Sequence, residues 1–194
     1  MKNKFILSII LGLLITFGTI IVSESAIEDI SSGIIRLHII ANSNEAIDQN
    51  LKLKVRDRIL KDFKLCDLEE IDLEQIKEIC EDEIKKNGFD YDARVVFGKY
   101  YFPTKSYENI TLPAGNYNAV RILIGKAEGE NWWCVMYPPL CFNTAANGDL
   151  DETELNILKQ SMKQDNYELI ENNEIKIKPA FKIVELWQKI KHRN

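Results

Sequence analysis

The sequence predicts an α+β fold: a single domain with a mostly antiparallel sheet and packed helices, after an N-terminal apolar segment. Three observations support this prediction. Helical periodicity dominates residues 45–87, whereas the alternation typical of strands dominates residues 91–137. Helical patterns return after residue 149, so helices and strands are grouped along the chain. The roughly 170 residues beyond the N-terminal segment suit one domain of ordinary size.

The N-terminal segment has the composition of a signal peptide or a membrane anchor. Residues 5–22 carry no charge and follow Lys2 and Lys4. A run of this length lies at the lower edge of what spans a bilayer, where ~20 residues are typical. We expect residues 1–25 to act as a signal peptide or membrane anchor, so that a globular domain over 30–194 is exported.

Cleavage of this segment and its retention as an anchor both remain open. Ser23 and Ser25 place small residues at positions −3 and −1 of a cut before Ala26, whereas the length of the apolar run favours an anchor. Removal of residues 1–25 would leave 23 basic and 29 acidic residues, a net charge of −6. An acidic domain argues against a nucleic-acid partner, whose binding surface would be basic.

The first elements of the domain are a strand and a helix. Residues 34–41 alternate between an apolar face and a mixed face, which predicts an interior strand. Asn42, with Glu45 three residues later, resembles a capping box that begins a helix over 45–63. The apolar stripe of this helix repeats every four residues, at Ile47, Leu51, Val55, Ile59 and Phe63.

A second helix is predicted between an Asp72 N-cap and Gly88, where a left-handed residue belongs. Its apolar stripe comprises Leu73, Ile76, Ile79, Cys80 and Ile84. Cys80 on this stripe favours a small core side chain, and a bridge between Cys66 and Cys80 stays open because the two helices are adjacent.

Strands are predicted next, over residues 91–98, 117–125 and 132–137, and residues 99–111 are either irregular or a short edge strand interrupted by Pro103. The polar loop at 126–131 contains two glycines and fits a hairpin. The strand at 132–137 is an unbroken apolar run, which predicts a central strand buried on both faces. Further on we expect a helix over 149–164, one or two strands over 167–178 and a last helix from Pro179.

Motifs of catalysis and metal binding are missing from the sequence. The chain has only two histidines, His38 and His192, and no Cys-x-x-Cys or His-x-x-x-His pair. The acidic residues near 147–158 lack the glycine and the final glutamate of a calcium loop. We therefore expect no enzyme, no metal and no cofactor, and favour a binding or signalling role. An exported enzyme of unknown activity and an envelope or cell-wall structural protein are the alternatives.

Five sequence blocks resemble the stage II sporulation protein R family of endospore-forming bacteria. They are RLHIIANS (36–43), LKLKVRDR (51–58), FPTKSY (102–107), LPAG (112–115) and NWWCVMYPPLCF (131–142). They occur in order, and the last block is the most specific.

The resemblance implies a signal rather than a catalyst. It implies export from the forespore to the intermembrane space, with anchoring through residues 5–22 as an option. There the protein would activate a membrane-embedded aspartic protease, its partner, which processes the precursor of mother-cell sigma factor E. The family offers no catalytic residues to transfer to this chain.

Two groups of residues are candidates for partner binding. The first is the corner after the strand at 132–137, because Trp and Tyr are frequent at binding hot spots. It comprises Trp133, Tyr137, Pro138, Pro139 and Phe142. The second is Asn42 and Ser43, at the end of an interior strand where ligand sites of α/β proteins often lie.

In an exported domain, Cys134 and Cys141 are expected to form a disulfide that holds the Pro-Pro corner. The closed loop is short, so the bridge should contribute about 2–2.5 kcal/mol to the free energy of unfolding. Iodoacetamide should then leave both sulfurs unmodified in the native mature protein. Prompt alkylation of both thiols would contradict the bridge.

Overall fold

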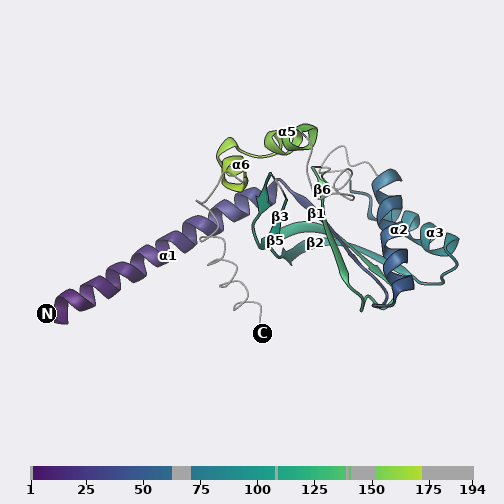
Figure 1. The fold of residues 1–194 in the computed structure, drawn as a ribbon, viewed down its shortest axis with the longest axis horizontal. Helices are drawn as coiled ribbons and strands as arrows, with labels where there is room; N and C mark the ends of the chain where they lie inside the picture. Colours follow the sequence, from purple (N-terminus) through teal and green to yellow (C-terminus); the bar gives the residue numbers. More distant parts are fainter. Residues whose placement is uncertain (1, 63–70, 108, 139, 141–151, 172–194) are drawn as a thin grey trace.

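The computed structural model describes residues 2–62, 71–107, 109–138, 140 and 152–171, and Figure 1 shows their arrangement. A long N-terminal helix leads into a four-stranded sheet, which is followed by small elements at one end. The elements are α1 (Lys2–Ser32), β1 (Ile35–Ile40), α2 (Ala46–Asp62), α3 (Leu73–Lys86), β2 (Ala93–Phe102), β3 (Lys105–Ser106), β4 (Thr111–Leu112), β5 (Gly115–Ile124), β6 (Asn131–Tyr137), α5 (Glu152–Gln160) and α6 (Gln164–Ile170).

The main sheet is mixed, with the strand order β2-β5-β1-β6. β1 pairs parallel with β5 and antiparallel with β6, and β2 pairs antiparallel with β5. The prediction of helices packed on a sheet in one domain is thus confirmed, but the sheet contains a parallel pair. A parallel pair needs a long crossover connection, and the chain between β1 and β5 provides it with α2, α3 and β2.

The central strand is β1, in which all six residues are buried, as the prediction of an interior strand required. The prediction that residues 132–137 form the central strand is wrong, because β6 lies at the edge of the sheet. Its middle residues Cys134, Val135 and Met136 are nevertheless buried. The predicted hairpin at 126–131 is also wrong, since β1 lies between β5 and β6.

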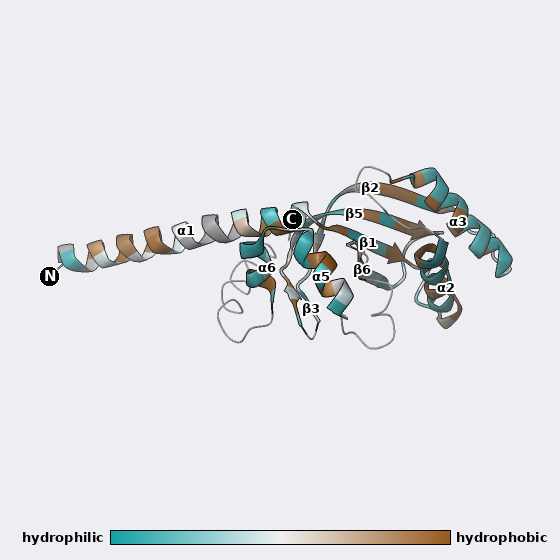
Figure 2. Cartoon of the chain, turned by 90° about the horizontal axis from the view of Figure 1, so that it is seen from above, coloured by the Kyte–Doolittle hydropathy of each residue, from teal (hydrophilic) through white to brown (hydrophobic). Residues whose placement is uncertain are grey.

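α2 and α3 cover one face of the sheet, and Figure 2 shows hydrophilic residues over much of their length. Leu51, Val55 and Ile59 of α2 are buried, as predicted, whereas Ile47 is 57% exposed and Phe63 lies outside the described residues. The four-residue spacing explains the error at Ile47. Each step of four residues turns roughly 40° past a full turn. A stripe of five such residues therefore winds around the helix, and its first and last members cannot face the same sheet as its middle members.

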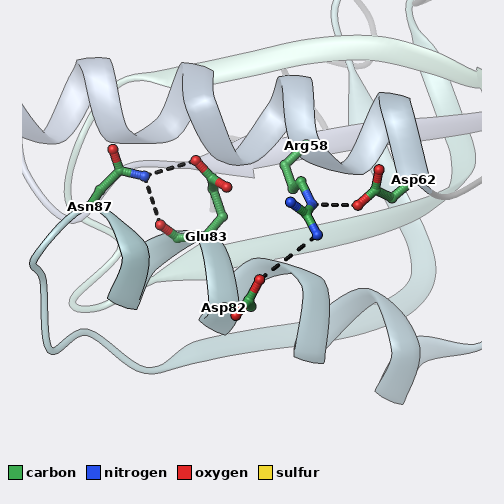
Figure 3. Close-up of polar contacts among 5 residues, drawn as sticks. All are labelled: Arg58, Asp62, Asp82, Glu83 and Asn87. Atoms are coloured by element: carbon green, nitrogen blue, oxygen red, sulfur yellow. Dashed lines mark hydrogen bonds and ion pairs between the residues drawn. The ribbon is translucent and has the colours of Figure 1, made fainter.

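Polar contacts join α2 to α3, as Figure 3 shows. Arg58 of α2 contacts Asp62 on its own helix and lies 3.8 Å from Asp82 of α3. At the end of α3, the Asn87 amide donates to the backbone carbonyl and the side-chain carboxylate of Glu83, over 2.7 and 2.8 Å. The ion pairs of Arg58 are partly exposed and add little stability compared with burial of apolar side chains.

The predicted boundaries of α3 are confirmed. Asp72 is the N-cap and accepts a hydrogen bond of 3.0 Å from the backbone N–H of Gln75. Gly88 after the helix has a φ of +83°, the left-handed conformation that favours glycine. Cys80 is a buried free thiol in the core, as expected, and Cys66 lies outside the described residues.

Other predicted boundaries need correction. Of the two alternatives for residues 99–111, residues 99–102 follow the edge strand, but as a continuation of β2, because they pair with the first residues of β5. The predicted strands over 167–178 are wrong at their start, where α6 buries Tyr167 and Ile170 three residues apart on one helix face. The helix predicted over 149–164 is α5, which is shorter, and the predicted last helix lies outside the described residues.

α1 projects from the domain as a long rod (Figure 1), and its last turns pack against the sheet. Ile27 and Ile30 are buried there, and a side chain at Gly115 of β5 would collide with Ile27. The apolar residues nearer the start of α1 are about half exposed or more: Ile6, Leu7, Ile9, Ile10, Leu11, Leu13, Leu14 and Ile15. Within the described residues, no helix combines the length and apolarity needed to cross a membrane. The predicted anchor is not confirmed.

The orientation of α2 can be tested with two isoleucines on the same helix. Ile59→Ala removes a side chain that is 1% exposed, so the free energy of unfolding should fall by about 2–5 kcal/mol. Ile47→Ala makes the same change at an exposed position and should shift it by less than about 0.5 kcal/mol. Urea denaturation followed by circular dichroism measures both. Equal losses would show that the helix is turned differently.

Candidate docking surface

The second face of the sheet packs at one end against a second hydrophobic core, and beside that core it carries polar and aromatic side chains. One row of cross-strand neighbours spans all four strands: Val96 of β2, Arg121 of β5, His38 of β1 and Trp133 of β6. His38 is buried, Arg121 and Trp133 are half-buried, and Val96 is 38% exposed. Elements at one end of the sheet cover the neighbouring row, but this row stays partly open.

His38 lies against Trp133 in the middle of this row. The two rings stack with centroids 3.6 Å apart and planes 18° apart, and Phe102 meets the Trp133 ring edge-on at 4.7 Å. The Nε2 atom of His38 lies 2.7 Å from Oδ1 of Asn131. An amide oxygen only accepts hydrogen bonds, so Nε2 carries the proton and donates. The stack fixes the Trp133 indole against a buried strand.

Burial lowers the pKa of His38 to about 4, because the imidazolium would lose its hydration. The hydrogen bond to Asn131 opposes this effect, and the nearby charge of Arg121 adds to it. His38 is therefore neutral at pH 7 and serves as a polar aromatic spacer between Arg121 and Trp133.

Arg36 is the most unusual residue of the central strand, since its side chain is only 1% exposed. Its Nε donates to the carbonyl oxygen of Cys134 over 3.0 Å. Its guanidinium carbon lies 4.6 Å from the centroid of Phe102 and 5.2 Å from that of Tyr117, which places the cation on two aromatic rings. Burial lowers the pKa of Arg36, yet guanidinium remains charged in proteins. A positive charge is thus held beneath this face.

Arg121 lies nearer to solvent on the same face. Its guanidinium carbon is 4.5 Å from the centroid of the Tyr100 ring. Gly98 makes room for that ring, because a Cβ there would lie 3.3 Å from two atoms of Tyr100. The Nε of Arg121 is buried and has no hydrogen-bond partner among the described residues.

We call this surface the arginine–aromatic face; its residues are Arg36, His38, Val96, Tyr100, Phe102, Arg121, Asn131 and Trp133. Two guanidinium groups lie among aromatic rings, and several of these side chains remain partly exposed. Within the described residues, no cluster of His, Cys, Asp and Glu is arranged to hold a metal ion. The face has the residue types that dominate protein-binding hot spots.

The structure separates the residues predicted at the corner after β6. Trp133 belongs to the arginine–aromatic face, whereas Tyr137 packs partly against the core beneath α2 and α3. Pro138 is buried, and Pro139 and Phe142 lie outside the described residues. Among the three described members of this group, Trp133 is the one that lies on the arginine–aromatic face. Its role in binding stays a prediction, as do those of the other four.

The predicted disulfide involves one residue that the structure describes. Cys134 is buried on the side of β6 that faces α2, as part of the core beneath that helix. Cys141 lies outside the described residues, so the pairing stays a prediction.

Asn42 and Ser43 link the C-terminal ends of β1 and β5 through hydrogen bonds. Both donate to Oδ2 of Asp48, from the Asn42 amide over 2.7 Å and the Ser43 hydroxyl over 2.6 Å. Asn42 also accepts a hydrogen bond of 3.0 Å from the backbone N–H of Lys126. Asn42 is therefore not the predicted cap of α2; instead Ser43 accepts from the N–H of Glu45 over 3.1 Å.

Asp48 is the acceptor at the centre of this network, and it is buried. Burial alone would raise its pKa, but the donors Ser43, Asn42 and Tyr91 outweigh burial, so the pKa of Asp48 lies below its ordinary value. Both predicted residues thus donate to one oxygen, Oδ2, of a buried carboxylate. This structural role does not test their predicted role in binding.

Sequence reasoning missed Arg121 and Tyr100, and it assigned His38 no role in binding. The available indication was the mixed face of β1, where Arg36 and His38 interrupt an otherwise apolar strand. Polar residues inside a fully buried strand require partners on the same face of neighbouring strands. The partners themselves follow from the strand order, which local patterns do not specify.

A partly open sheet face rich in Trp, Tyr and Arg is typical of a binding protein. A family model for stage II sporulation protein R matches residues 31–147. Stage II sporulation protein R of Bacillus subtilis (strain 168) is 36% identical over 159 residues, which cover 76% of this chain and 70% of that protein. No solved structure matches. The chain belongs to the stage II sporulation protein R family, which confirms the resemblance of its sequence blocks.

The buried imidazole makes the stability depend on pH. The unfolded chain binds a proton to His38 near pH 6.5 and the folded chain only near pH 4. Between these values the unfolded state binds more protons, so stability falls as the pH falls. One pKa unit corresponds to about 1.4 kcal/mol, so the total loss is at most about 3 kcal/mol, and it is smaller to the extent that solvent screens the ring.

His38→Phe keeps an aromatic ring beside Trp133 but does not titrate, so it should lack this loss. Urea denaturation of both proteins between pH 7 and pH 3.5 gives the difference between their free energies of unfolding. Acidic groups titrate in both proteins, so their contributions cancel in this difference. Parallel curves for the two proteins would mean that His38 is not buried in its neutral form.

Proposed function

We propose that this protein is an exported signal of sporulation that acts from the forespore on the mother cell. In this proposal it activates a membrane-bound aspartic protease, which then processes the precursor of mother-cell sigma factor E. Membership in the stage II sporulation protein R family supports a role in sporulation and is the observation on which the proposal depends. The protein would act by binding rather than by catalysis.

Export is part of the proposal. The charge-free run at residues 5–22 follows two lysines, which is the composition of an export signal. The domain would then face the intermembrane space, with residues 1–25 removed or kept as an attachment to the membrane. Its net negative charge gives no reason to expect a nucleic-acid partner.

Activation by binding requires a preference between two states of the protease. A ligand shifts an equilibrium only to the extent that it binds one state more tightly. Aspartic-protease sites use two carboxylates that share one proton, and these often come from two halves. We therefore propose that this protein binds the assembled form of the protease, in which both halves are in place.

The proposal predicts that three components suffice for processing. The full chain, the protease and the sigma factor precursor should be co-expressed in a host that does not sporulate, and cleavage scored by immunoblot. The full chain should produce the shortened sigma factor. A chain that lacks residues 1–25 should produce little, because it would stay on the wrong side of the membrane.

Two controls show that cleavage depends on the protease and on export. Omission of the protease should abolish cleavage, and replacement of residues 1–25 by an unrelated cleavable export signal should restore it. If the full chain produces no cleavage while all three components are expressed, the proposed function is wrong.

A further inference from the structure

Arg121 and its neighbours form a polar row that the packing of the domain does not fully cover. Val96, Arg121 and Trp133 occupy equivalent positions on three strands, with buried His38 between the last two. Val96 is 38% exposed, Asn131 beside the row is exposed, and Arg121, Trp133 and Tyr100 are half-buried. A row of this composition, left partly open, provides area for a partner.

The two positive charges of the arginine–aromatic face have no ion-pair partner within the described part of the chain. Arg36 and Arg121 appear in none of its ion pairs, although the whole chain has 30 acidic and 25 basic residues. Arg36 is 1% exposed and lies out of reach of a partner, whereas the side chain of Arg121 is half-buried. The Arg121 guanidinium can therefore bind a carboxylate of a partner through its part that remains open to solvent.

The aromatic rings define how an acceptor would reach Arg121. Tyr100 lies against the guanidinium of Arg121 at 4.5 Å, so the plane of the cation is held in place. Trp133 is fixed on the other side of the row by its stack on His38. A guanidinium held in this way binds a carboxylate through two parallel hydrogen bonds, a geometry that lysine lacks.

We propose that the arginine–aromatic face binds an acidic segment of the partner protease, with a carboxylate on Arg121 and an apolar side chain on Trp133. This inference rests on the proposed function and identifies the surface that carries it. The complementary charge selects an acidic partner. A membrane surface and a second copy of this acidic chain are the other occupants, and the crosslinking experiment below distinguishes them from the protease.

Charge reversal at Arg121 tests the proposal in the co-expression assay. Arg121→Glu should lower the yield of processed sigma factor by about tenfold or more, because loss of a hot-spot arginine is compounded by repulsion. Arg121→Gln should give a smaller loss without repulsion. Lys86→Glu makes an equal change in charge at an exposed position of α3, on the opposite face of the sheet, and should leave processing unchanged. Circular dichroism and thermal unfolding of each purified chain show whether it is folded.

A photo-crosslinker identifies the occupant directly. In the same cells, p-benzoylphenylalanine at exposed Val96 should crosslink to a peptide of the protease that contains Asp or Glu, whereas the same group at exposed Ile47 on α2 should not. Crosslinks from Val96 to lipid or to a second copy would overturn the proposal.

Failure of this inference and failure of the proposed function give different results. Normal processing by folded Arg121→Glu would overturn this inference and leave the proposed function intact. Absence of processing by the wild-type chain would overturn the proposed function, and this inference with it.

Discussion

Burial of β1 on both faces is the constraint on which the rest of the structure depends. The strand lies between β5 and β6, and each of its six residues is shielded from solvent. Leu37 and Ile39 meet α2 and α3 on one side, where apolar contact is sufficient. On the other side Arg36 and His38 cannot be buried without partners. That requirement explains why aromatic rings and carbonyl groups gather opposite them.

The two faces of the sheet are therefore built on different principles. Beneath α2 and α3 the core is aliphatic, and the polar contacts between these helices lie at its periphery. On the arginine–aromatic face, cation–π contacts and ring stacking replace aliphatic packing around Arg36, His38 and Arg121. Such contacts hold side chains at fixed angles, whereas aliphatic packing mainly fills volume. A surface that is fixed before binding loses less entropy when a partner docks.

The turn after β1 has a different role from that face. Asn42, Ser43 and Asp48 join the exits of two parallel strands, a location where many α/β proteins bind ligands. Here the side chains are occupied by one another, and the loop before β6 passes so closely that a side chain at Gly129 would collide with the Ser43 carbonyl. Position in the topology alone thus gives no evidence of a ligand site.

The sequence by itself determined the elements whose information is local, namely β1, α2 and α3 with its caps, together with the family and hence a role in sporulation. Only the tertiary structure decided that residues 131–137 form an edge strand. Cys134, Val135 and Met136 are buried although β6 lies at the edge of the sheet, because other elements cover both of its faces. The apolar sequence pattern of such a covered edge strand is the same as that of a strand in the middle of a sheet. The tertiary structure also decided that Arg121, 83 positions from His38 in the sequence, is its neighbour. Strand order depends on pairing between distant segments, and the arginine–aromatic face exists only once that order is set.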